Sequence, residues 1–268
     1  MGVNKIYNTE GVPSARIVND HDFDIAMGLI AYKRRFSRFG FNSDVNTEED
    51  IWSGGGLYPW PETAERFRVA ANGDPADDVN GDGARNVIIQ YLDEDWLQKI
   101  EILDTAGASA SAFTVGKGYR LIRAFNTKVG LFGGKNIGII KIEHENTDAV
   151  IGHISAGQGI TQMSQYTVPA NEFGFLFNLL MTVSTGNAGN IKVFTRLNAN
   201  NLVAPFGATH LAASFDDIIG TIPKSGISAR IAPFTDIWFT GEKVSGGGNA
   251  SFSINYDLRL VETSFLVE

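Results

Sequence analysis

The sequence contains no cysteine, which excludes disulfides, thiolate metal sites and a cysteine nucleophile. Methionine is scarce, with 4 residues, and proline is limited to 8 in a chain of 268. No apolar run approaches the roughly 20 residues that cross a bilayer, and residues 1–10 are polar, so we expect neither a membrane segment nor a signal peptide. Basic residues are outnumbered, 22 against 30 acids, for a net charge of −8. Phosphate binding needs clustered Lys and Arg, so nucleic acid is not expected as the main partner.

Glycine and aromatic residues are abundant. There are 30 Gly and 18 Phe, and 43% of the residues are hydrophobic. Short apolar runs bounded by Gly recur at the spacing of β-strands, and no long helical crossover separates them. The pattern therefore predicts an all-β protein, built as antiparallel β-sandwich or jelly-roll-like lobes with an extended N-terminal arm.

Alternation of apolar and polar residues marks the individual strands. The clearest is 251–261, where Phe252, Ile254, Tyr256, Leu258 and Leu260 share one face. The other segments expected to be strands are 66–69, 86–92, 97–103, 111–115, 119–125, 137–144, 149–154, 161–168, 173–183, 190–197 and 236–242.

The chain is expected to divide into an arm and two lobes. Residues 1–46 show little hydrophobic repetition, so this arm is expected to gain order on a neighbouring subunit. The polar run 145–148 is the best place to separate two β-sandwich lobes, 47–146 and 147–268.

Large aromatic side chains gather in Gly- and Pro-rich segments, above all between Phe39 and Pro61. Such side chains are hard to hide within one subunit, so we expect them to divide about evenly between interface anchors and core residues of loops packed on the sheets. A basic run, residues 33–38, adds charges that an acidic partner could meet, although short charge runs are usually only solvated. The predicted interface residues are Arg34, Arg35, Phe39, Phe41, Trp52, Tyr58, Trp60, Phe132 and Phe206.

Several phrases in the chain resemble a family of tailed-bacteriophage virion structural proteins. They are Asp44-Val-Asn, Glu49-Asp-Ile-Trp-Ser-Gly-Gly-Gly, Tyr58-Pro-Trp-Pro, Gly83-Ala-Arg, Tyr91-Leu-Asp-Glu-Asp-Trp, residues 110–123 and Tyr166-Thr-Val-Pro-Ala. The resemblance covers most of the chain after about Phe39. It implies a particle component of the head-associated cement or decoration type, located in the virion and assembled in the host cytoplasm. Its implied partners are the major capsid protein or other virion subunits.

One acidic loop has the spacing of a calcium ligand set. Asp78, Asn80 and Asp82 alternate before a Gly, as in the first half of an EF-hand loop. Ile89 occupies the position of the bidentate Glu, however, and a strand follows, so an EF-hand is excluded. An acidic turn is the preferred interpretation, and no metal or other cofactor is expected.

Other catalytic patterns are weak. Lys135 follows two glycines but lacks the P-loop spacing, and His144 and His153 are not spaced as metal ligands. The acids 93–95 are expected to form a turn rather than a carboxylate pair, and no nucleophile elbow occurs. We therefore expect a structural protein with no enzymatic activity, in a homotrimer or another symmetric oligomer. The alternative is a collar, tail or head-fibre component that binds a host receptor or carbohydrate.

Overall fold

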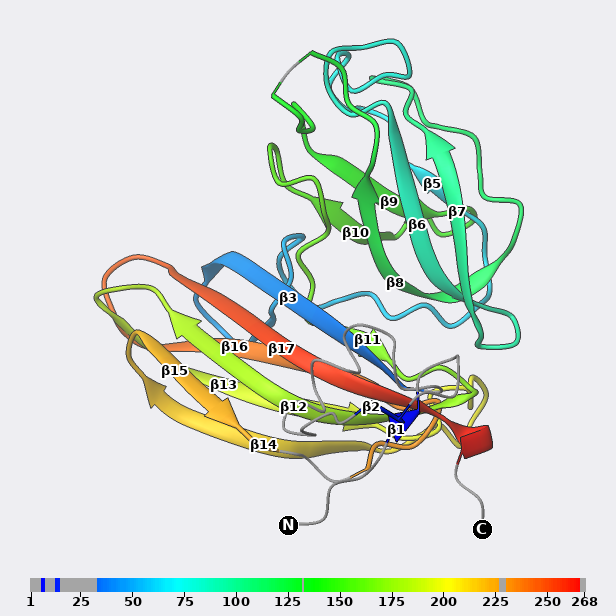
Figure 1. The fold of residues 1–268 in the computed structure, drawn as a ribbon. Helices are drawn as coiled ribbons and strands as arrows, with labels where there is room; N and C mark the ends of the chain where they lie inside the picture. The colour runs from blue at the N-terminus through cyan, green and yellow to red at the C-terminus, as the bar shows by residue number, and fades with distance from the viewer. Residues whose placement is uncertain (1–5, 8–12, 15–32, 132, 227–229, 266–268) are drawn as a thin grey trace.

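The computed structural model describes residues 6–7, 13–14, 33–131, 133–226 and 230–265. Within these residues every regular element is a β-strand except the short 3-10 helix η1 (Thr263–Phe265). All of the strand pairs are antiparallel, so the all-β fold class is confirmed. Figure 1 shows two lobes, a larger sandwich and a smaller one. None of the described residues belongs to a helix that is long and apolar enough to cross a membrane.

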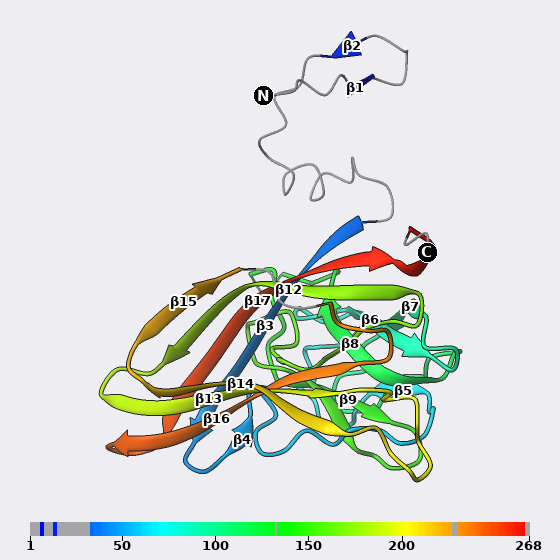
Figure 2. The same ribbon diagram turned by 90° about the horizontal axis from the view of Figure 1, so that it is seen from below.

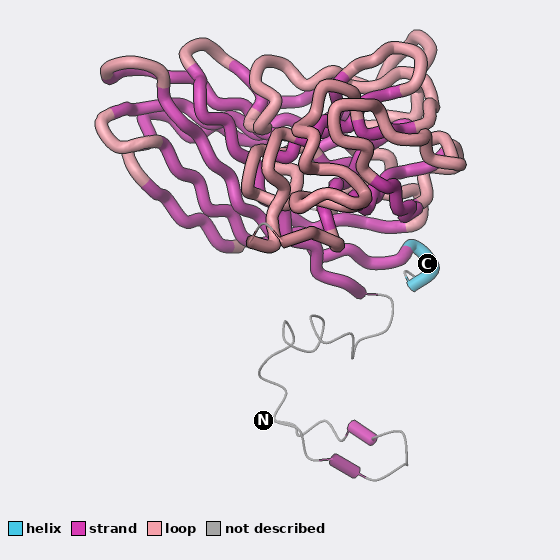
Figure 3. The backbone as a smooth tube through the Cα atoms, turned by 90° about the horizontal axis from the view of Figure 1, so that it is seen from above, coloured by secondary structure: helices cyan, strands magenta, loops and turns pink. Residues whose placement is uncertain are grey.

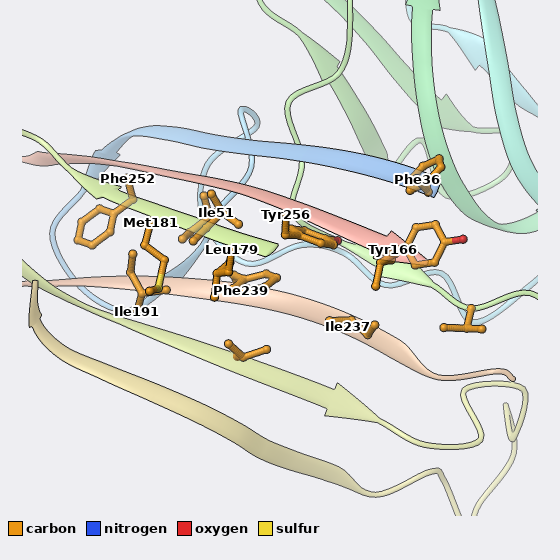
Figure 4. Packing of buried hydrophobic residues seen from close by; sticks show 14 of the residues in the cluster. Phe36, Ile51, Tyr166, Leu179, Met181, Ile191, Ile237, Phe239, Phe252 and Tyr256 are labelled. Carbon is orange, nitrogen blue, oxygen red and sulfur yellow. The ribbon is translucent and has the colours of Figure 1, made fainter. Parts of the chain in front are cut away.

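The large lobe consists of two facing sheets. One has the strand order β15-β12-β17-β3, and the other has the order β11-β16-β13-β14, with β4 paired to β16. The core side chains lie between these two layers (Figure 4). The strands are β3 (Lys33–Val45), β4 (Glu49–Asp50), β11 (Tyr166–Thr167), β12 (Glu172–Val183), β13 (Asn187–Arg196), β14 (Thr209–Ile218), β15 (Thr221–Ser225), β16 (Asp236–Gly246) and β17 (Ala250–Glu262).

Strand β17 forms the centre of this core. The five side chains expected on its inner face, from Phe252 to Leu260, are all 0% exposed. Its partner β12 adds Leu179, Met181 and Val183 to the same core. The alternation of apolar and polar residues in β17 therefore correctly predicted which face of the strand is buried.

The small lobe is also built of two sheets, each with three strands. Their orders are β10-β9-β5 and β7-β6-β8, and a second apolar core, including Phe67, Tyr91 and Ile142, lies within this lobe. The strands are β5 (Phe67–Val69), β6 (Asn86–Asp93), β7 (Gln98–Asp104), β8 (Gly118–Asn126), β9 (Ile140–His144) and β10 (Val150–Ile154). Figure 3 shows that loops gather around this lobe, whereas long strands dominate the large one.

The small lobe is an insertion between β4 and β11 of the large lobe, not the first of two successive lobes. The expected boundary at 145–148 is the turn of the β9–β10 hairpin, where Val150 pairs with Glu143. A polar run marks a hairpin turn as readily as a domain boundary, because both face solvent.

The last part of the expected arm, residues 33–45, is a strand of the large lobe. β3 pairs along its length with β17, from Lys33 opposite Val261 to Val45 opposite Ala250, and lies beside it in Figure 2. Phe36 and Val45 of this strand belong to the core. The rest of the expected arm contains only the short paired strands β1 (Ile6–Tyr7) and β2 (Pro13–Ser14), and its other residues lie outside those described.

Two expected strands differ from the structure. Residues 111–115 run along β5 as a loop, with Ser111 N bonded to Val69 O and Thr114 N to Phe67 O. The segment 161–168 contributes only the two residues of β11. Conversely, β14 and β15 were not expected, because nearly all their side chains are exposed and no buried face is visible in the pattern.

Candidate functional site at the junction of the lobes

A buried carboxylate, that of Asp236 in β16, joins the two lobes. Its side chain is 0% exposed. Arg120 of β8, itself 3% exposed, places Nε 3.1 Å from Oδ1 and Nη2 3.3 Å from Oδ2. Arg196 of β13 donates Nε to Oδ2 at 2.8 Å, and the Thr167 hydroxyl donates to Oδ1 at 2.6 Å. Two guanidinium groups thus share one negative charge, and both oxygens of the carboxylate are occupied.

Aromatic rings surround these guanidinium groups. The Trp60 ring centroid lies 5.2 Å from Cζ of Arg120 and 5.0 Å from Cζ of Arg196, which is cation-π distance. Trp60 also meets Trp238 edge to face at 5.5 Å. Trp60 is therefore a packing residue of the junction, held between two cations.

A cavity of about 320 Å³ opens beside this cluster. Side chains from both lobes line it, including Trp60, Glu62, Arg120, Arg196, Asn201 and Phe206. An aromatic surface next to amide and charged groups can bind a polar ring such as a sugar. The Trp60 and Trp238 rings are inclined by 65°, however, so they do not form a flat stacking platform.

Trp52 and Tyr58, both predicted as interface anchors, belong to the interior. They are 5% and 4% exposed and lie in the core of the small lobe, edge to face at 5.3 Å. The loop between them is closed by Asp50, whose Oδ2 accepts a hydrogen bond from Tyr58 N at 2.6 Å. The Trp52 indole lies over Gly54, where a Cβ would come within 2.2 Å of the ring. Gly54 therefore leaves room for the Trp52 ring, and the burial of Trp52 and Tyr58 places both side chains in the interior instead of on an exposed loop surface.

The two predicted arginines are paired within the chain. Arg34 holds Glu172 through two bonds of 2.6 Å, and Arg35 holds Asp257 at 2.6 Å. Both keep partly exposed side chains, at 36% and 45%. They can still face a partner, but neither offers a guanidinium that is free of an internal carboxylate.

Of the predicted aromatic anchors, two are exposed. Phe206 is 63% exposed and Phe39 is 41% exposed, while Phe41 is half-buried. Phe132 lies outside the described residues. The interface role of the exposed pair stays a prediction.

An apolar row that was not singled out from the sequence crosses the outer face of the β7-β6-β8 sheet. Ile102 pairs with Ile88, Ile88 with Phe125, and Phe125 with Ile160. Ile102 is 60% exposed and Ile160 39%, and Ile100 on the same face is 55% exposed. The opposite face of the sheet carries core residues such as Val87 and Leu103. The sequence contained a signal for this row. A strand with one buried face alternates apolar and polar residues, whereas 86–92 and 97–103 have apolar residues on both faces.

A basic cluster lies where β3 meets the small lobe. The Cζ atoms of Arg34, Arg38 and Arg123 lie 5.9, 5.9 and 4.0 Å from the Phe36 ring centroid. We call these three arginines and Phe36 the Phe36 cluster. Arg38 donates to the carbonyl oxygens of Ile122 and Gln165, which ties β3 to β8 and to the residues before β11.

The loop with the spacing of a calcium ligand set contains an Asx turn, as the preferred interpretation of an acidic turn requires. Asp78 Oδ1 accepts a hydrogen bond from Asn80 N at 3.0 Å, which forms an Asx turn. Neither Asp78 nor Asp82 belongs to a group of three acidic or histidine side chains placed to hold a metal, and no such group occurs within the described part of the chain.

The neighbouring Asp77, which was not predicted, organises this loop. It is 3% exposed, and its carboxylate accepts hydrogen bonds from Ala84 N at 2.7 Å, Ile137 N at 2.9 Å and Gly138 N at 2.8 Å. It thereby ties the loop to the segment before β9.

The remaining candidate side chains have structural surroundings. His144 is buried with its Nδ1 3.9 Å from Glu65 Oε2, and burial lowers its pKa to about 4. Asp93 accepts backbone hydrogen bonds from Asp95 N and Leu97 N, which forms the turn between β6 and β7. The turn interpretation of the acids 93–95 is therefore supported.

Comparisons with known proteins identify only weak structural similarities. No family model matches the chain, and no curated protein matches it. Among solved structures the chain is similar to infectious bursal disease virus Gt strain (9% identity, 88% of this chain and 74% of that chain, TM-score 0.24). It is also similar to the VP2 subviral particle of that virus (11%, 85% and 71%, 0.25) and to T=1 particles derived from it (8%, 87% and 70%, 0.26). TM-scores of 0.24 to 0.26 mark only a weak likeness in fold.

Proposed function

We propose that this protein is a non-enzymatic structural subunit of a virus particle, and more specifically a cement or decoration protein of a tailed-bacteriophage head. A role in assembly is supported by the apolar row of Ile102, Ile88, Phe125 and Ile160. This row lies on the outer face of a sheet whose other face packs into the core of the small lobe. Ile102 and Ile160 are exposed and Ile88 and Phe125 are half-buried, and apolar side chains gathered on an outer face mark interaction surfaces. The phage assignment is supported by the sequence phrases between Asp44 and Ala170.

A cement protein acts by covering apolar area between capsomers. Each apolar Å² removed from water contributes roughly 25 cal/mol, and symmetric assembly repeats that contribution in every copy. The partners are then the major capsid protein and other copies of this chain, in a homotrimer or another symmetric oligomer. Arg34, Arg35, Phe39, Phe41 and Phe206 remain candidate contacts, whereas Trp52 and Tyr58 would act only by shaping the small lobe.

Cryo-electron microscopy of the particle tests this function. Copies arrayed over the whole head are expected, whereas a single ring at one vertex would assign the chain to the collar or tail. Absence of the chain from purified particles would exclude a virion role.

A pair of variants tests the apolar row itself. Ile102→Asp should reduce the number of copies bound per particle at least tenfold, because a charge would be buried at the contact. Val115→Asp is the matched control, since Val115 is 91% exposed and lies outside the row. Equal binding of both variants would remove the row from the interface.

The cavity at the junction of the lobes favours a second candidate, a head-fibre or tail component that binds carbohydrate. Phe206 and Trp60 bring aromatic surface to the cavity, and Asn201 and Glu62 bring hydrogen-bonding groups. A glycan array should then show binding that Phe206→Ala weakens, and the exposed position of Phe206 makes loss of folding no concern. Absence of any glycan binding counts against this candidate.

A further inference from the structure

The cavity at the junction of the lobes lies beside positive charge that the described residues do not balance with ion pairs. Arg120 and Arg196 both pair with Asp236, and within the described part of the chain this carboxylate is their shared and single ion-pair partner. Two positive charges therefore meet one negative charge. Because Asp236 is 0% exposed and both guanidinium groups lie at cation-π distance from Trp60, water screens the remaining charge less than it would at an open surface.

Arg196 is the arginine that can bind a further group. Nε and Nη2 of Arg120 bind Asp236, and its Nη1 donates to two backbone carbonyl oxygens. Arg196 also gives Nε and Nη2 to Asp236, whereas its Nη1 has no hydrogen-bond partner among the residues that the structure describes. The Arg196 side chain lines the cavity and is 26% exposed, and its Nη1 is not one of the unpartnered side-chain atoms that are buried. The N–H groups of Nη1 are therefore available to a ligand in the cavity.

The other walls of the cavity suit a sugar ring. Trp60 and Phe206 contribute apolar surface, and the exposed side chains of Asn201 and Thr209 form no hydrogen bond with other described residues. Amide and hydroxyl groups can pair with the hydroxyl groups of a saccharide. The cavity volume of about 320 Å³ lies within the range of small-ligand sites, roughly 300 to 1,000 Å³.

The loop 197–208, which carries Phe206, is held in place by its own backbone. Leu197 N donates to Ala208 O at 3.3 Å, and a Cβ at Gly207 would come within 1.8 Å of Leu197 O. The two ends of the loop are therefore in close contact. A wall that is formed before the ligand arrives lowers the entropy cost of binding.

A carboxylate is the group that suits Nη1 of Arg196. Arginine forms strong charge-assisted hydrogen bonds with carboxylates. A net charge of −8 on the chain favours a singly charged group over a phosphate dianion. Glu62 also lines the cavity, but it is exposed and forms no ion pair with the described arginines, so solvent screens its charge.

We propose that the junction cavity binds a saccharide that carries a carboxylate, such as a uronic acid, with the carboxylate on Nη1 of Arg196 and the sugar ring against Trp60 and Phe206. This inference rests on the carbohydrate-binding candidate function of the same cavity and adds the chemical class of the sugar. It is independent of the role of the apolar row.

A glycan array tests the proposal on the full chain, with the array used once with free carboxylates and once after methyl esterification. Saccharides with free carboxylates should give signals at least about tenfold above those of their methyl esters, because the ester keeps the sugar ring and loses the charge. The signals of the free acids should also fall at high salt.

Three variants separate the carboxylate contact from the contact with the ring. Arg196→Lys can keep an ion pair with Asp236 but has no Nη1, so it should lose the preference for free acids over esters. Phe206→Ala should weaken acids and esters alike and keep their ratio. Lys192→Gln is the matched control and should change neither signal, because Lys192 is a cation of the same strand, also 26% exposed, that pairs with Glu48 outside the cavity.

The possible outcomes distinguish this inference from carbohydrate binding itself. Equal signals for free acids and their esters would overturn the inference and leave carbohydrate binding in place, whereas no signal for any saccharide would overturn both. Preference for acids that persists in Arg196→Lys, with its fold verified by circular dichroism, would place the carboxylate elsewhere and overturn the inference. The comparison of acids with esters uses the unmodified chain, so it decides the matter even if Arg196→Lys does not fold.

Discussion

Arg120 in the small lobe and Asp236 in the large lobe form an ion pair in which both side chains are almost completely buried, at 3% and 0% exposure. The pair spans 116 positions of sequence and connects β8 to β16. Arg196 and Thr167 donate hydrogen bonds to the same carboxylate. The small lobe is therefore connected to the large lobe by a network of hydrogen bonds and ion pairs in addition to apolar packing.

Removing the charge of Asp236 should therefore be severe. Asp236→Asn leaves two guanidinium groups without a counterion, and we expect the free energy of unfolding to fall by about 3 to 5 kcal/mol. Urea unfolding followed by tryptophan fluorescence measures the change. Glu48→Gln, which breaks the exposed pair with Lys192, should cost less than about 1 kcal/mol. Similar losses in the two variants would contradict the structural role of Asp236.

Two buried groups should give opposite pH dependence. Burial raises the pKa of Asp50 from 3.8 to about 6, so the native state binds its proton more tightly and this group makes stability fall as pH rises from about 4 to 6. Burial lowers the pKa of His144 from 6.5 to about 4, so this group makes stability fall as pH drops through the same range. Each contribution is of the order of 3 kcal/mol, and in the unmodified chain they largely cancel.

Substitution of either group should expose the other. Asp50→Asn should give a protein whose stability rises between about pH 4 and 6.5, and His144→Gln one whose stability falls between about pH 4 and 6. Urea midpoints collected across this pH range measure both slopes. A flat profile for both variants would show that neither group titrates away from its ordinary pKa.

The sequence predicted the parts of the fold that rest on local alternation. The alternate residues of β17 from Phe252 to Leu260 are buried as expected. In a strand with one solvent-exposed face, apolar and polar residues alternate, so the buried face can be identified from the sequence. β14 and β15 could not be found this way, since nearly every side chain in them is exposed. β3 was mistaken for an arm because the partners of its inward-facing Arg34 and Arg38, Glu172 and two backbone carbonyls, are distant in sequence.

The candidate sites depended on contacts between distant positions. No local motif connects Arg120, Arg196 and Asp236, so the junction of the lobes had no sequence signature. The exposure of the aromatic candidates could not be predicted from the sequence for the same reason. Composition identifies Trp52 and Phe206 as large apolar side chains, but only the fold decides that the first is buried and the second exposed.

The packing of Trp52 against Gly54 gives a direct test of the loop. In Gly54→Ala the new Cβ would lie 2.2 to 2.6 Å from three atoms of the indole, so the ring must move. We expect a loss of about 1 to 3 kcal/mol, as for overpacking elsewhere in cores, together with a shift in tryptophan emission. Gly247→Ala is the control, because it meets no atom within 4 Å. An unchanged emission spectrum in Gly54→Ala would show that the loop adapts without moving Trp52.

Variants of Asp77 and Asp78 in the acidic loop can distinguish a structural carboxylate from a metal ligand. Asp77→Ala removes the acceptor of three backbone N–H groups, those of Ala84, Ile137 and Gly138, and unsatisfied buried donors cost about 1 to 3 kcal/mol each. Asp78→Ala removes one exposed Asx-turn bond and should cost less than about 1 kcal/mol. Thermal unfolding of both variants, with and without 5 mM Ca²⁺, distinguishes the roles. If the loop is a turn held by Asp77, then Ca²⁺ leaves the melting temperature of the unmodified chain unchanged. A rise that Asp78→Ala abolishes would instead identify Asp78 as a calcium ligand.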